Sequence, residues 1–301
     1  MYNGEITDAH QHLWDYKFKY SHGWLNSKSH PWTGDWTMLA NNYLIDDYLK
    51  DIKNQNVVKS VHVEAEWNDS PGAWGETIWL DKLSKSHNFP NSIIGHVNLF
   101  NDNVEHVINK HLESSNLFNG IRHNQFNHDS DKDFIFSDIN MMQSDKWLTN
   151  FKLLKKYNLS FDLGCFYNQL IDASNVAKKN PDSKIILNHV GQPIKRDASE
   201  FNRWKEGIKK ISDNKNVYCK LSGVTMTDHQ WSIKSIGEIF YYVIECFGIN
   251  RCLVASNFPV DKLFGSYDQI YNAYKEVLQN YSYDESKKLF SENANEAYKI
   301  I

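Results

Sequence analysis

The stretch ITDAHQHLWD, residues 6–15, begins the pattern from which the fold is predicted. It is a short, mostly apolar run of β-forming residues that carries two histidines, His10 and His12, separated by one residue. Runs of the same kind recur at regular intervals along the chain. Together with the first they cover residues 5–14, 57–66, 92–100, 117–124, 159–166, 183–191, 216–223 and 251–259.

Helical segments alternate with these runs. Apolar residues recur with helical spacing in 43–55, 74–87, 103–115, 145–158, 235–248 and, closing the chain, 283–300. Eight strands alternating with helices predict an α/β fold, a (β/α)8 TIM-type barrel with an extra C-terminal helix. An open doubly wound sheet is the alternative, but the GxGxxG turn expected after its first strand is missing. No linker rich in Pro, Gly or Ser divides the chain, so we expect one domain, residues 1–301.

Composition limits the class of protein and its partners. With 41% hydrophobic residues and a formal net charge of -4, the chain can bury a full core and has no excess of basic residues for nucleic acid. No apolar run reaches the roughly 18 residues of a membrane helix, and the N-terminus lacks a signal-peptide pattern. We therefore expect a cytoplasmic protein that binds a small molecule, with homo-oligomer formation left open. The cysteines form no CxxC pair, which favours buried free thiols.

The first connection, residues 13–42, is about thirty residues long and rich in aromatic residues. A long loop in this position lies over the C-terminal face of a barrel, where active sites of this fold are found. Its rings either pack a small core under the loop or line a pocket, and Trp32 is our candidate for contact with a substrate. The aromatic residues are Trp14, Tyr16, Phe18, Tyr20, Trp24, Trp32 and Trp36.

Polar and ionisable side chains end most of the predicted strands. His10 and His12 are two apart on a strand and should point to the same face. Desolvating so many such groups at one rim is costly, so we expect the rim to bind or catalyse. The other candidates at this rim are Glu64, Glu66, Arg122, His123, Asp162, His189, Lys220 and Asn257.

His10, His12 and His189 suit two different tasks. As neutral imidazoles they are candidate ligands of one divalent metal ion, zinc first, in an open site. As hydrogen-bond donors they would instead polarise a carbonyl group with no cofactor. Both alternatives stay open at this point.

Six motifs in order carry a resemblance to a known family. They are DAHQHLW, GETIWL, GIRH, LNHVGQP, CKLSG and SNFPVD, and the match extends from residue 6 to the ENANEAY segment at 292–298. The chain resembles the amidohydrolase-related proteins of the amidohydrolase superfamily. Within them it is similar to the lactonase group, the hydrolases of L-fuconolactone, L-rhamnonolactone and 2-pyrone-4,6-dicarboxylate.

The resemblance implies roles for the residues at the rim. His10, His12 and His189 would gather around a lactone carbonyl, with or without a divalent metal. Arg122 and Lys220 would hold a substrate carboxylate or hydroxyl groups, since an arginine fork suits a carboxylate well. His123, Glu66 and Trp32 complete the expected substrate-binding set.

The sequence departs from the family at the residue that accepts the proton of the attacking water. The family pattern is Ser-Asp-Trp-Pro, whereas this chain has Ser256, Asn257, Phe258 and Pro259. An amide cannot take up a proton near neutral pH, so Asn257 occupies the general-base position without the base. Three explanations stay open: an engineered Asp→Asn form, a natural enzyme with another base, or a homologue with altered or lost hydrolysis. The other bases considered are His189, His123, Asp261 and a metal-bound hydroxide.

Three functions follow as hypotheses. The leading one is a hydrolase that opens a small sugar-acid or dicarboxylate lactone at the barrel mouth. The second is a metal-dependent decarboxylase of the same superfamily, for which Asn257 matters less. The third is a non-catalytic ligand-binding homologue.

Overall fold

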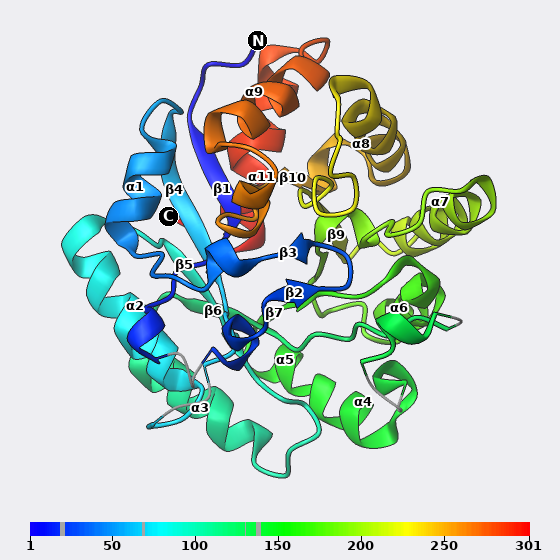
Figure 1. The fold of residues 1–301 in the computed structure, drawn as a ribbon. Coiled ribbons are helices and arrows are strands. Elements are labelled where there is room, and N and C mark those ends of the chain that lie inside the picture. The colour runs from blue at the N-terminus through cyan, green and yellow to red at the C-terminus, as the bar shows by residue number, and fades with distance from the viewer. Residues whose placement is uncertain (19–21, 68–69, 130, 137–139) are drawn as a thin grey trace.

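A computed structural model describes residues 1–18, 22–67, 70–129, 131–136 and 140–301. Tyr20 of the first connection lies outside these residues. Eight parallel strands form one sheet whose order follows the chain, so the predicted α/β barrel is confirmed (Figure 1). The strands are β1 (Ile6–Gln11), β4 (Val57–Val63), β5 (Ser92–His96), β6 (Phe118–Arg122), β7 (Ser160–Leu163), β8 (Ile185–Leu187), β9 (Val217–Leu221) and β10 (Cys252–Val254).

The ring closes just beyond β10, beside the candidate site. The Asn257 N–H donates to the His10 carbonyl at 2.8 Å, and the His12 N–H donates to the Phe258 carbonyl at 2.8 Å. Asp8 reinforces this seam, because its carboxylate accepts from the backbone N–H and the hydroxyl of Ser256 at 2.8 and 2.6 Å. The backbone of the two motifs DAHQH and SNFP is therefore held in one rigid unit.

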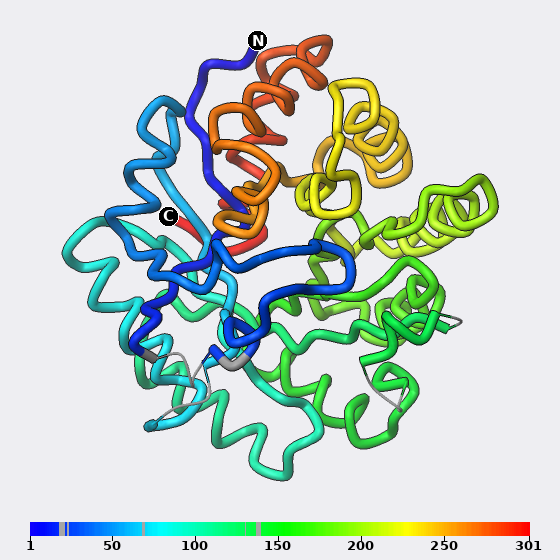
Figure 2. Tube along the Cα trace, in the orientation of Figure 1, coloured from blue at the N-terminus to red at the C-terminus, as the bar shows by residue number. Residues whose placement is uncertain are grey.

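Helices surround the strands as an outer ring, each returning the chain to the start of the next strand (Figure 2). The predicted segment 145–158 is divided in two at Lys152. Buried apolar faces hold the ring against the sheet; in α8, for example, Ile236, Phe240 and Val243 are buried. The helices are α1 (Ile45–Ile52), α2 (Trp74–His87), α3 (Val104–Ser114), α4 (Asp145–Phe151), α5 (Leu153–Lys156), α6 (Leu170–Lys179), α7 (Ala198–Ser212), α8 (Ile233–Phe247) and α9 (Tyr267–Val277).

The predicted C-terminal helix is present as α10 (Tyr283–Lys287), a π-helical turn (Lys288–Glu292) and α11 (Asn293–Ala297). It packs against β1, where the Thr7 hydroxyl lies 3.1 Å from that of Ser291. Ala294, Ala297 and Tyr298 join an apolar cluster formed by small and branched strand residues inside the barrel. The helix thus closes one end of the barrel and leaves the other end for the site.

The first connection folds over that other end. Its short hairpin, β2 (Ser29–His30) with β3 (Gly34–Asp35), crosses the centre of the ring in Figure 1. Trp14 is fully buried and packs edge to face on Trp24, which in turn contacts Trp36. The aromatic residues of this connection do both of the things expected of them: Trp14 belongs to a small core, whereas Trp24, Trp32 and Trp36 line a cavity.

All four cysteines are unpaired, as predicted; three of them are buried as predicted, whereas Cys246 is half-buried. In the part of the chain that the structure describes, no helix combines the length and apolar character needed to cross a membrane.

Candidate active site

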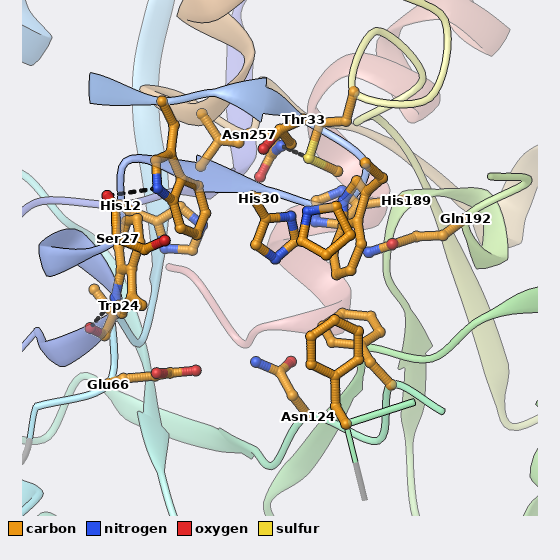
Figure 3. A pocket seen from close by; sticks show the side chains of 18 of the residues that line it. His12, Trp24, Ser27, His30, Thr33, Glu66, Asn124, His189, Gln192 and Asn257 are labelled. Atoms are coloured by element: carbon orange, nitrogen blue, oxygen red, sulfur yellow. Dashed lines mark hydrogen bonds between the residues drawn. The ribbon is translucent and has the colours of Figure 1, made fainter. Parts of the chain in front are cut away.

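A cavity of about 520 Å³ lies at the C-terminal ends of the strands, beneath the β2–β3 hairpin (Figure 3). Seven of the candidate residues named from the sequence line it, namely His12, Trp32, Glu64, Glu66, Arg122, His189 and Asn257, together with Trp24 and Trp36 of the aromatic first connection. The other candidates at the rim, His10, His123, Asp162 and Lys220, are buried and are absent from its lining. Several lining residues were not predicted: His30, Asn124, Gln192 and Met226. Of these, Gln192 belongs to the LNHVGQP motif and Asn124 directly follows GIRH, so their positions in or beside these motifs could have identified them as candidates.

His10 and His12 meet as the HxH spacing predicts, with their Nε2 atoms 3.1 Å apart. This contact between the two rings depends on an irregularity in β1. Asp8 pairs with Ser60 and Gln11 pairs with His62, so β1 advances by three residues where β4 advances by two. Asp8 points outward to Tyr48 and Tyr267 on the helices, at 3.1 Å each. A bulge of this kind re-aims the side chains that follow it, which brings His10 into the barrel.

The hydrogen bonds fix the proton positions on both rings. Nδ1 of His12 lies 2.6 Å from the Val63 carbonyl, which only accepts, so this nitrogen carries the proton. Burial lowers the pKa of both imidazoles well below the ordinary value, so they are neutral. His10 must then donate from Nε2 to His12, and its Nδ1 accepts from the Lys220 ammonium at 3.1 Å.

Lys220 is buried beneath the cavity and bonded on two sides. Its Nζ lies 2.5 Å from the Asp162 carboxylate, which also accepts from the Tyr298 hydroxyl at 3.0 Å. Burial lowers the pKa of Lys220 to about 8, while Asp162 opposes that shift. In this arrangement Lys220 orients His10 and makes no contact with the cavity.

His189 lies in a short turn that follows β8, not in the strand itself. Its φ of 51° is left-handed, which turns the ring toward His10, with the ring centroids 4.5 Å apart. Nδ1 lies 2.9 Å from the Ser222 hydroxyl. Gly223 is required beside it, because a Cβ at that position would come within 2.7 Å of the imidazole. Burial and the Lys220 charge lower the pKa of His189 well below its usual value, so the ring is neutral.

Arg122 and Glu64 form an ion pair at the cavity wall. Arg122 Nε donates to the Glu64 carboxylate at 2.6 Å, and Nη2 donates to the Glu64 carbonyl oxygen at 2.6 Å. Burial alone would raise the pKa of Glu64, but the guanidinium overrides it and lowers the pKa to about 2. The positive charge of Arg122 also lowers the pKa values of His12 and His189.

Asn257 adopts a left-handed backbone conformation, with φ of 58°. Its amide nitrogen donates to the buried Asp261 carboxylate at 2.7 Å and lies 3.2 Å from the Met226 sulfur. Both partners are acceptors, so the amide oxygen is the atom left for other contacts. Burial raises the pKa of Asp261 to about 7.

His10, His12 and His189 are the predicted ligands of a zinc ion. Across the described segments, no group of three or more His, Cys, Asp or Glu side chains is arranged to hold one. The proton on His10 Nε2 also faces His12, so neither ring presents a free lone pair along that line. In this structure the two rings bond to each other, and the zinc site predicted from the sequence stays a prediction.

Comparison with known proteins gives a consistent family. A family model described as "Amidohydrolase" matches residues 7–300. The chain is 36% identical over 296 residues, 98% of both chains, to an uncharacterized protein, y4mH, of Sinorhizobium fredii. It is 23% identical to L-fucono-1,5-lactonase of Burkholderia multivorans, covering 87% of this chain and 85% of the relative. Among solved structures, an amidohydrolase from Burkholderia multivorans with bound zinc superposes with a TM-score of 0.84 at 20% identity, covering 99% of this chain and all of that one.

Proposed function

The chain belongs to the amidohydrolase family, as its motifs predicted, and on that premise we propose that it opens a lactone ring by attack of water at the carbonyl carbon. The observation that carries the proposal is the composition of one cavity. It combines a neutral imidazole, a fixed amide oxygen and a buried guanidinium, supplied by His189, Asn257 and Arg122. The similarity to a lactonase supports a cyclic ester as the substrate.

His189 is the proposed general base. Of the three side chains considered as alternatives to an aspartate, His123 accepts from the Leu99 N–H and lies outside the cavity lining, and Asp261 lies buried behind Asn257. His189 lines the cavity and is neutral, so its ring can accept a proton from water. Asn257 would hold that water through its amide oxygen without taking the proton.

The charge that develops on the carbonyl oxygen needs a positive group nearby. Arg122 lines the cavity, and its charge already acts on His12 and His189. The same field would stabilise the oxyanion of the tetrahedral intermediate. When the ring C–O bond breaks, the proton held by His189 passes to the departing ring oxygen, and the product is a hydroxy acid.

The test is hydrolysis of a lactone panel by the purified protein, including L-fucono-1,5-lactone, with and without a chelator. We expect turnover that persists after chelation and that falls about 10²–10⁴-fold in His189→Gln, the range for loss of a general base. The matched variant Asp261→Asn should retain activity within about threefold, because it keeps an oxygen acceptor for Asn257.

Other outcomes would contradict the proposal and favour a different function or a different base. Loss of activity on chelation, restored by zinc, would assign carbonyl polarisation to a metal ion. Release of CO₂ from a dihydroxybenzoate with no lactone opened would favour the decarboxylase. Tight lactone binding without turnover would favour the ligand-binding homologue, and loss of activity in Asp261→Asn alone would make Asp261 the base.

A further inference from the structure

The described lining of the cavity contains more acidic than basic side chains. Its charged lining residues, among those described, are Glu64, Glu66 and Arg122. The histidines of the lining do not add positive charge, because burial lowers the pKa of His30 to about 4 and those of His12 and His189 well below the ordinary value. The remaining polar lining consists of neutral hydroxyl and amide side chains.

Arg122, the cationic side chain among the described lining residues, already binds Glu64. Two nitrogens of Arg122 bond to the Glu64 side chain and carbonyl oxygen, both at 2.6 Å, so the guanidinium is held in one orientation by Glu64. A substrate carboxylate would have to compete with Glu64, whose pKa of about 2 reflects how strongly Arg122 holds it. Arg122 was expected to bind a substrate carboxylate, but Glu64 already occupies its guanidinium group.

Glu66 lies on the opposite side of the cavity from Asn257 (Figure 3). Its carboxylate points toward the Asn124 amide, and its backbone N–H donates to the Glu64 carboxylate at 2.8 Å. Burial and the negative charge of Glu64 raise the pKa of Glu66. A field that disfavours the charge of Glu66 also disfavours any second carboxylate placed beside it.

Aromatic rings form the walls between these two sides. Trp24 and Trp36 contact one another, and Trp32 packs near Phe126 with ring centroids 5.5 Å apart. Such walls suit a ring that presents C–H groups, with a few polar contacts to fix its orientation. A carboxylate at the far side suits hydroxyl groups, since its two oxygens can accept from two neighbouring O–H donors.

We infer that Glu66 is a specificity-determining residue that binds neighbouring hydroxyl groups of an uncharged, hydroxylated lactone and excludes a carboxylate at the same place. The inference rests on the proposed function, because it assumes that the substrate is a lactone. It adds the chemistry of the part of the substrate that lies beside Glu66. Dicarboxylate lactones are thereby disfavoured.

The first experiment compares two substrates that differ in one group. D-galactono-1,4-lactone ends in a hydroxymethyl group, where D-galactaro-1,4-lactone carries a carboxylate. We expect at least a 30-fold preference in kcat/KM for the neutral lactone. In Glu66→Gln the preference should fall below threefold, with the loss on the neutral lactone appearing mainly in KM. Glu113→Gln, a carboxylate on the exposed surface of α3, is the matched control and should change neither value.

The second experiment needs no turnover and separates this inference from the proposed function. The probes are 1,5-anhydro-D-galactitol, which has no carbonyl, and its 6-carboxylate, with binding measured by calorimetry. Tighter binding of the neutral probe that is lost in Glu66→Gln would support the role of Glu66 even if no lactone is hydrolysed. Equal or tighter binding of the carboxylate, failure of the neutral probe to bind, or an unchanged ratio in Glu66→Gln would overturn it.

Discussion

Asp261 is a buried carboxyl group whose environment makes it a weak acid. It accepts from the Asn257 amide at 2.7 Å, yet burial raises its pKa to about 7, against roughly 3.9 in an unfolded chain. Between these two pH values the folded protein retains a proton that the unfolded chain has released. The free energy of unfolding should therefore fall as the pH rises from about 4 to about 7.

Asp261→Asn should remove this contribution while keeping an acceptor for Asn257. We expect the variant to show a smaller fall in unfolding free energy between pH 4 and pH 7. At pH 8 it should be more stable than the parent by at least about 1.4 kcal/mol, the equivalent of one pKa unit. Urea unfolding at pH 5 and pH 8 measures both. Burial also raises the pKa of Glu76 to about 7, so part of the slope should remain; an undiminished slope would show that Asp261 does not titrate as described.

The contact between Asn257 and Asp261 could not be predicted from the sequence, although the exchange of Asp for Asn at position 257 could be recognised there. The SNFPVD motif places an amide where the family pattern has an acid. Only the structure shows that a second carboxyl group, four residues later, faces that amide. A carboxylate at position 257 would share one proton with Asp261, so Asn257→Asp alone would not provide an ordinary base.

At the scale of elements, the turn after β8 and the bulge in β1 decide which side chains reach the cavity. Strict alternation places Asp8, His10 and His12 on one face, but the bulge sends Asp8 outward to the helices and the two imidazoles inward. His189 reaches the cavity through a left-handed turn and not as a strand residue. The periodicity of apolar residues predicts the strands well, because it reflects which side chains are buried. It does not reveal a one-residue bulge or a positive φ.

The C-terminal helix contributes to the site from the opposite end of the barrel. Tyr298, directly after α11, donates to Asp162, which holds Lys220, which in turn donates to His10. Tyr298→Phe keeps the buried ring and removes one hydrogen bond to a charged acceptor, so we expect a loss of about 1.5–3 kcal/mol in unfolding free energy. Since Tyr298 lies outside the cavity lining, KM should be unchanged. Urea unfolding and steady-state kinetics test this, and a changed KM with unaltered stability would contradict it.

Across the whole molecule, polar side chains form a layer between the apolar cluster inside the barrel and the cavity. Pairs in this layer join strands from different parts of the ring: Lys220 on β9 bonds to Asp162 on β7, and Arg122 on β6 bonds to Glu64 just after β4. The eight strands and their order follow from the sequence pattern. The pairing could not be predicted, because each candidate was a plausible substrate contact until its partner was known, as with Lys220, which lies below the cavity.

The Lys220–Asp162 pair gives a test of what this layer contributes to the fold. Both side chains are fully buried, so Lys220→Met leaves a carboxylate without its counter-charge and should cost about 3–5 kcal/mol in unfolding free energy. Lys220→Met combined with Asp162→Leu removes both charges and should recover much of that loss, because the desolvation cost of the pair disappears with it. Urea unfolding of the parent, both single variants and the double variant completes the cycle. A double variant as unstable as the sum of the single ones would mean that the two charges act independently, and that the layer does not hold the strands together through this pair.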